Sequence, residues 1–357
     1  MGMVSVNDEY FNILKEQGNL QEIQNMINRA GGETVFRFEE YIWKTVNGEI
    51  NLSLESILEL LGNVAFSGVH SGTDELIRII GIALIAAVFT NFSFSFREAN
   101  IADTAFYVSY VLLYGILATT FYGAYEITLD VVRHITDFMK VLAPSYCIAI
   151  VLGCGSVTSV QWYETVMLLV TLAEYVILKL ILPLIGMHMM VNLASNLSRE
   201  NMLSKFCEIL ELIVGWGLKT LIAVVIGITG IRGRLAPAID RVKRTTLIKS
   251  AGSIPGIGNA IDGINESLLG AGALLKDAFG AGGMIAIMVI SGIPLVRLAV
   301  YTFLYKAEAA MIQPVSDQRI VNCINAASKS SAMMLKTVFV AATLFIISIA
   351  LVANSCS

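Results

Sequence analysis

The sequence predicts an all-α fold, that of a polytopic helical membrane protein with about six or seven transmembrane helices. Amphipathic or re-entrant helices and a small helical N-terminal region are expected beside them. The 357 residues are 56% hydrophobic and only 15% charged, whereas soluble domains are ~45–50% apolar and ~25% charged. Several apolar runs also reach the ~20 residues that a helix needs to cross a bilayer. Much of this surface must therefore face something other than water.

Charge divides the chain into two regions. Residues 1–75 hold twelve acidic and four basic residues, a net charge of −8, whereas the whole chain carries −4. We therefore predict an acidic, soluble helical N-terminal region over 1–75 and a mildly basic transmembrane domain over 76–357. This distribution argues against nucleic-acid binding, which requires a basic face.

The N-terminal region shows helical spacing of apolar residues over 6–30 and 35–47, and again from Ser53 to Phe66. Three short helices form little core by themselves. We expect them to pack on the transmembrane domain or on a partner.

The apolar runs define the expected spans. The run at 141–159 contains Pro144 and small residues, so it either spans or is re-entrant, which gives seven spans or six. Residues 127–140 are amphipathic and favour a helix along the membrane interface. The spans are expected near 77–96, 104–125, 141–159, 165–190, 208–231, 283–305 and 333–353.

The basic segment 232–249 indicates the orientation. It carries six basic residues and one acidic residue, which is typical of a cytoplasmic loop. With seven spans, a cytoplasmic 232–249 places the N-terminal region outside the cytoplasm.

The stretch 251–283 holds nine glycines, and its apolar residues recur every three or four positions. This pattern predicts an amphipathic helix near 254–279, held by packing because glycine disfavours an isolated helix. It is either an amphipathic helix at the cytoplasmic interface or a re-entrant, pore-lining element at an oligomer axis. The candidate helix-packing residues are Ile257, Ile261, Ile264, Leu268, Gly270 and Gly272.

Ionisable residues inside the apolar runs form a second candidate site. Glu174 occurs near Lys179 and Glu211 near Lys219, but Glu211 and Lys219 are eight residues apart, ~12 Å along a helix, so each needs another partner. Buried charges usually face a bundle interior or water, although lysines also snorkel to an interface. They therefore either pair structurally or line a polar path. The candidate pore or polar-path residues are Glu174, Lys179, Glu211, Lys219, Asp262, Glu266 and Arg297.

Catalytic signatures are missing from the sequence. It contains no HExxH, GxSxG or GxxxxGK[ST] motif. We therefore expect no enzymatic activity, no catalytic residue, no cofactor and no metal.

Three stretches resemble the stage III sporulation protein AE family, polytopic membrane proteins of endospore-forming bacteria. They are Gly230-Ile-Arg-Gly-Arg-Leu-Ala-Pro237, the glycine- and isoleucine-rich stretch 251–283, and Ala309-Ala-Met-Ile-Gln-Pro314-Val-Ser-Asp317 followed by Ile320-Val-Asn-Cys323. The resemblance runs from about Asp74 to the end of the chain.

The resemblance implies a subunit of the channel-like, secretion-like assembly that links mother cell and forespore. It places the protein in the mother-cell membrane around the forespore, with the other proteins of the complex and membrane lipid as partners. We expect a non-enzymatic homo-oligomer that forms or gates the conduit. The alternatives are a secondary transporter or permease and a membrane scaffold that recruits the other subunits.

Overall fold

The computed structural model describes residues 20–31, 36–46, 99–153, 156–197, 203–252, 258–314 and 318–353. For 99–106, 109, 156–157, 232–252, 258–269 and 271 it describes the course of the helix without the side chains. Within the described ranges every regular element is a helix and no strand occurs. The prediction of an all-α fold is thereby confirmed.

Five described helices are long and apolar enough to cross a membrane, by length and composition. This number is roughly consistent with the six or seven spans predicted, and the expected span 77–96 lies outside the described residues. The chain is a multi-pass membrane protein. The five segments are Tyr110–Leu152, Thr158–Leu197, Ser204–Ile231, Gly272–Ile312 and Gln318–Ala353.

Helix α5, Ala99–Gly153, joins segments that the sequence analysis treats separately. It contains the expected span 104–125, the amphipathic 127–140 and most of 141–159. The apolar face of 127–140, including Val131, Ile135 and Phe138, is buried in the core, so it packs against other helices instead of lying along the interface. Pro144 lies inside the same helix, and α5 neither spans twice nor re-enters.

The next long helical segment consists of three consecutive elements: α6 (Ser156–Ala173), the π-helical η1 (Glu174–Ile181) and α7 (Leu182–Leu197). In η1 the hydrogen bonds skip one residue more than in an α-helix, and the Leu182 N–H donates to the Ile177 carbonyl oxygen. Such insertions are rare and often lie at functional sites. They also rotate the helix faces on either side relative to each other.

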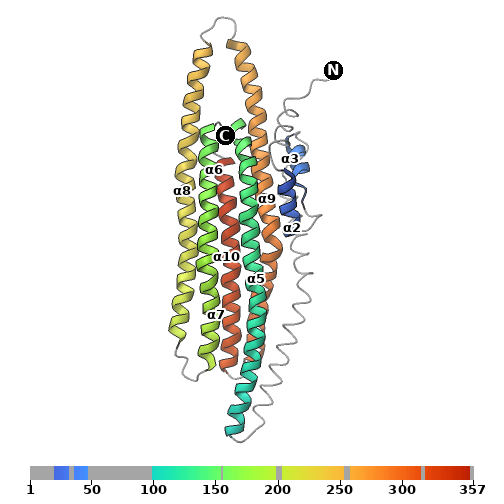
Figure 1. Cartoon of the computed structure of the whole chain (residues 1–357), viewed down its shortest axis with the longest axis vertical. Coiled ribbons are helices and arrows are strands. Elements are labelled where there is room, and N and C mark those ends of the chain that lie inside the picture. The colour runs from blue at the N-terminus through green and yellow to red at the C-terminus, as the bar shows by residue number, and fades with distance from the viewer. Residues whose placement is uncertain are drawn as a thin grey trace.

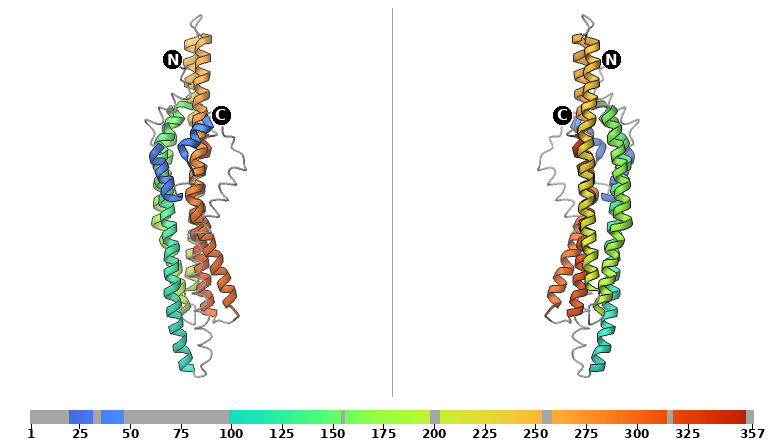
Figure 2. Two further views of the ribbon diagram at one scale, coloured as in Figure 1. Left: turned by 90° about the vertical axis from the view of Figure 1, so that its right-hand side faces the viewer. Right: turned by 90° about the vertical axis from the view of Figure 1, so that its left-hand side faces the viewer.

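Helices α8 (Ser204–Gly252) and α9 (Gly258–Ile312) form a hairpin whose tip extends beyond the other helices (Figures 1 and 2). The basic segment 232–249, expected as a loop, is the last part of α8. The glycine-rich stretch from 258 onward is the first part of α9 and continues into the expected span 283–305 without a break. A separate interfacial or re-entrant helix over 254–279 is therefore not formed.

Helix α10, Gln318–Ala353, is the central helix and packs on α5, α6, α7, α8 and α9 (Figure 1). Its most extensive neighbour is α9. Many of its buried residues are Ala and Ser, and such small side chains let helices approach closely.

Two short N-terminal helices, α2 (Leu20–Gly31) and α3 (Phe38–Val46), lie beside α9 (Figure 1). The Gln24 side chain joins them, because its Nε2 donates to the Phe36 carbonyl oxygen at 2.8 Å and its Oε1 accepts from the Phe38 N–H at 2.7 Å. The Phe38 ring then packs edge-on against Phe279 of α9, with centroids 5.6 Å apart.

Candidate functional site: polar contacts across the apolar bundle

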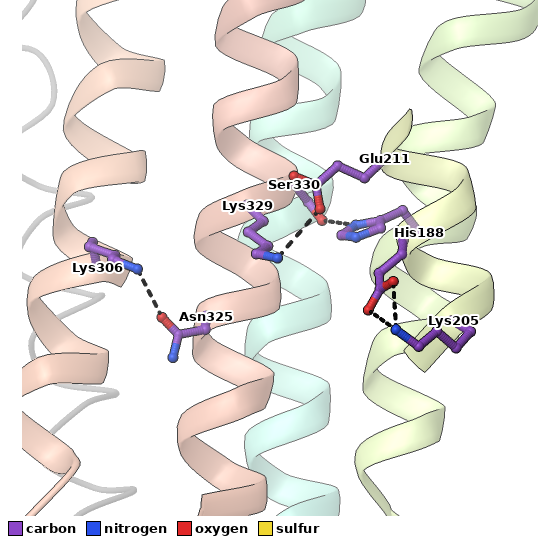
Figure 3. A network of polar contacts seen from close by, with 8 residues as sticks. His188, Lys205, Glu211, Lys306, Asn325, Lys329 and Ser330 are labelled. Atoms are coloured by element: carbon purple, nitrogen blue, oxygen red, sulfur yellow. Dashed lines mark hydrogen bonds and ion pairs between the residues drawn. The ribbon is translucent and has the colours of Figure 1, made fainter. Parts of the chain in front are cut away.

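One turn of α10 makes polar contacts with three other helices, and Figure 3 shows two of them, those of Lys329 and Ser330. Ser328 Oγ donates to the Thr302 carbonyl oxygen of α9 at 3.1 Å. The next residue, Lys329, pairs with Glu211 of α8, Nζ to Oε2 at 3.4 Å. Ser330 Oγ and His188 Nδ1 of α7 then share a hydrogen bond of 2.9 Å. Because successive residues of a helix point in directions ~100° apart, three consecutive side chains reach three neighbours.

The contacts of this turn differ in burial. His188 and Ser330 are fully buried, whereas Lys329 and Glu211 keep 59% and 44% of their side chains exposed. The neutral hydrogen bond therefore lies in the core and the ion pair at its edge. A buried polar pair needs its partner, and an exposed ion pair contributes little in water, so the His188–Ser330 contact holds α7 on α10 more strongly than the Lys329–Glu211 pair holds α8.

Glu174 does not pair with Lys179, its near neighbour in the sequence, but contacts another helix. Glu174 Oε2 lies 3.3 Å from Lys140 Nζ of α5, and the same ammonium lies 3.1 Å from Asp137. Lys179 is exposed and has no partner among the described residues. The pairing thus joins the first residue of η1 to α5.

Lys179 and Lys219 lie at the same level of two adjacent, antiparallel helices. A Cβ on Gly217 of α8 would stand 2.8 Å from Ile181 of η1, and two residues further along each helix, in opposite directions, come Lys219 and Lys179. Both lysines are exposed, and neither has a partner among the described residues. Two unpaired cations therefore lie at one level on the outside of the bundle.

The remaining candidates are more scattered. Arg297 is half-buried on α9. Gly270 is exposed with open space beyond it, and Gly272 is buried. Asp262, Glu266, Ile261, Ile264 and Leu268 belong to the part of α9 whose side chains lie outside the described residues, and Ile257 lies outside them altogether.

The close packing on α9 occurs further along the glycine-rich stretch. A Cβ on Gly280 would stand 2.8 Å from the Tyr146 hydroxyl of α5, and one on Gly283 would stand 2.8 Å from Leu142. A Cβ on Gly282 would stand 3.0–3.3 Å from Phe38, Tyr41 and Ile42 of α3. The absence of side chains at these three positions lets α9 approach α5 on one side and α3 on another.

Sequence reasoning did not single out His188, Ser330 or Lys329 as partners. A usable signal was the run Ser328-Lys-Ser-Ser331 inside an apolar helix, because serines at consecutive positions must face several neighbours. No group of three or more His, Cys, Asp or Glu side chains in the described part of the chain could hold a metal ion. These polar contacts position the helices relative to one another, and the Lys329–Glu211 pair places charged groups at the edge of the bundle.

Comparison with known proteins gives one family. The family model described as stage III sporulation protein AE matches residues 36–356. The stage III sporulation protein AE of Bacillus subtilis (strain 168) is 20% identical over 308 residues, which cover 86% of this chain and 77% of that protein. No solved structure matches.

Proposed function

The chain belongs to the stage III sporulation protein AE family, and we propose that copies of it form or gate the membrane conduit of a channel-like complex between mother cell and forespore. Family and apolar helices make it a multi-pass membrane protein of a sporulation family. The proposal adds the conduit, the homo-oligomer, the mother-cell membrane and the other proteins of the complex as partners. The proposed role is non-enzymatic.

The exposed lysines Lys179 and Lys219 carry the proposal. Lys219 lies within the apolar segment Ser204–Ile231, and Lys179 lies inside Thr158–Leu197. A charged side chain near the middle of a bilayer costs at least ~2.5–3.5 kcal/mol, so an outward-facing pair requires water or an acidic partner. A neighbouring protomer can supply the acidic partner, and a water-filled path between protomers can supply the water. A transporter acting as a monomer would instead direct such charges into its own bundle.

The outer face of α8 supports close contact between copies. Its most apolar window is 28% buried, the smallest share of the five long helices described. Gly215, Gly227 and Gly230 open onto empty space on this face, and Trp216 beside them is 68% exposed. Small residues on a membrane helix allow a second helix to approach closely.

The mass of particles purified in detergent and in lipid discs tests the proposal. We expect a closed ring of several protomers, which dissociates in the double variant Lys179→Gln, Lys219→Gln and in Gly227→Leu. Gly123→Leu is the matched control, because Gly123 of α5 also faces open space but away from α8. A monodisperse monomer with unchanged wild-type activity in sporulation would overturn the homo-oligomer.

We also propose that the N-terminal helices and the α8–α9 hairpin lie on one side of the membrane. Phe38 contacts Phe279, near the end of the bundle from which the hairpin extends (Figure 1). The structure has α5 as one helix where two spans were expected. If the expected span 77–96 is kept, the chain then crosses the membrane six times in place of seven, and the two regions that were predicted on opposite sides lie on the same side. The positive charge of 232–249 favours the cytoplasm for both, whereas the sequence-based orientation placed residues 1–75 outside it.

A further inference from the structure

Glu308 of α9 is a buried carboxyl group that none of the contacts above uses. It is 5% exposed, and neither Oε1 nor Oε2 has a hydrogen-bond partner among the described residues. It lies on a buried face of α9 with Tyr305 and Ile312, which are 1% and 6% exposed. The Tyr305 hydroxyl, one turn away, is likewise buried without a partner in the described part of the chain.

Two contacts locate Glu308 relative to α10. Lys306 Nζ lies 3.4 Å from Asn325 Oδ1, and Ser328 bonds to Thr302. Both pairs follow one antiparallel register, which places Glu308 at the level of Cys323. On the α5 side, Tyr305 faces Thr120, whose hydroxyl donates to its own helix, to the Ile116 carbonyl oxygen at 2.6 Å. The carboxyl group is thus enclosed between α5, α9 and α10.

Among the described residues, the titratable and charged groups at this level do not compensate an ionised Glu308 carboxylate. On α9, Lys306 is exposed and directed to Asn325, and Tyr305 is the titratable group that interacts with Glu308. On α10, Arg319 interacts with Tyr110 and Cys323. On α5, the Tyr110 hydroxyl donates to the Leu193 carbonyl oxygen. An ionised carboxylate buried without a counter-ion is far less stable than the neutral acid.

We propose that the Glu308 carboxyl is a proton-binding site of the bundle, occupied while α5, α9 and α10 are packed and vacated only when this end of the bundle admits water. A proton needs one oxygen, whereas Ca²⁺ takes six to eight oxygen ligands and Mg²⁺ an octahedron. One carboxyl and one phenol, the groups that the described residues supply here, are too few for either ion. The inference is independent of the oligomer and of the conduit.

Infrared difference spectroscopy of the full-length protein in lipid tests the site. The spectrum of wild type minus Glu308→Gln should contain, at neutral pH, the carbonyl band of a protonated carboxylic acid without a hydrogen bond. Glu211→Gln is the control, since the Glu211 carboxylate pairs with Lys329 and should remove a carboxylate band. Glu308→Gln keeps the size and neutrality of the protonated side chain, so it should fold.

Thermal unfolding provides a second readout. Wild type should lose stability as the solution is made alkaline, because ionisation of Glu308 forces this end of the bundle to open, and Glu308→Gln should lose measurably less. A carboxylate band instead of the acid band at neutral pH would overturn the proposal. Identical alkaline profiles for the two proteins would also overturn it, because the proton would then be unlinked to packing.

Discussion

Lys276 Nζ donates a hydrogen bond of 2.8 Å to the carbonyl oxygen of Ala353, so a buried ammonium closes the last turn of the central helix α10. Lys276 is 1% exposed, and its other contact is the exposed Asp277 at 3.2 Å. The last carbonyl groups of a helix lack partners within the helix, and a cation there also interacts favourably with the helix dipole. The contact ties α9 to the end of α10.

Replacing Lys276 by Met should therefore destabilise the end of α10. Methionine keeps an apolar side chain of similar length, but the Ala353 carbonyl group loses its hydrogen-bond donor. This loss should lower the free energy of unfolding by ~1–3 kcal/mol. Hydrogen exchange should accelerate in the last turn of α10, and the melting temperature should fall. Lys336→Met is the matched control, because Lys336 also lies in the bundle, on α10 itself, but its side chain is exposed. Equal exchange in both variants would mean that the contact adds nothing.

Glu211→Leu should impair the protein more than Glu208→Leu. Glu211 joins α8 to Lys329 of α10, whereas Glu208 pairs at 3.0 Å with Lys205 of its own helix and is 63% exposed. The loss of unfolding free energy should be up to ~1 kcal/mol if the ion pair is exposed to water, and larger if it faces lipid. Thermal unfolding measures it, and Lys329→Met should reproduce the Glu211 effect without adding to it.

Gly282→Leu should detach α3 from α9. A side chain at this position meets the rings of Phe38 and Tyr41, and overpacking typically costs ~1–3 kcal/mol. Limited proteolysis should then cut the N-terminal helices faster. Gly270→Leu is the control, since Gly270 faces open space and its replacement should gain up to ~1 kcal/mol of helix propensity. Faster cleavage in both variants would point to a general loss of stability.

Docking of α3 should weaken at alkaline pH. Burial raises the pKa of the Tyr41 phenol above its usual value of about 10, so the docked state favours the neutral phenol. Its contribution is complete below the unfolded pKa and is lost as pH rises from that value through the folded one. Proteolysis of the N-terminal helices across this range should show the loss in wild type. Tyr41→Phe should remove this pH dependence, and it should not weaken docking, because the buried Tyr41 hydroxyl has no hydrogen-bond partner among the described residues.

Reporter fusions at Asn51 and at Lys249 should give the same type of signal. The proximity of α3 to the base of the α8–α9 hairpin requires this result, and the basic segment favours the cytoplasmic type. Opposite signals at the two sites would restore the seven-span topology and would show that α3 leaves α9 in the membrane.

The fold class follows from composition and apolar run length alone, but the number of helices does not. Acidic residues and Pro144 interrupt the hydropathy of α5, and only tertiary packing shows that Val131 and Phe138 are core residues. The partner of Glu174 is Lys140, 34 residues away, and no local spacing indicates it. The sequence likewise locates the glycines without showing which of them face a neighbour. The sequence gives no sign that Glu308 is buried, because an acidic residue two positions after Lys306 is typical of the polar end of a membrane-spanning helix.

The length of the apolar helices has a consequence for the lipid around them. Tyr110–Leu152 has 43 residues and Gly272–Ile312 has 41, so each measures roughly 60–65 Å, whereas a bilayer core is ~30 Å thick. Tilting and local thickening compensate only a modest hydrophobic mismatch. Long parts of α5 and α9 therefore lie outside the hydrocarbon core, and any apolar side chain exposed on those parts needs a protein neighbour to shield it from water.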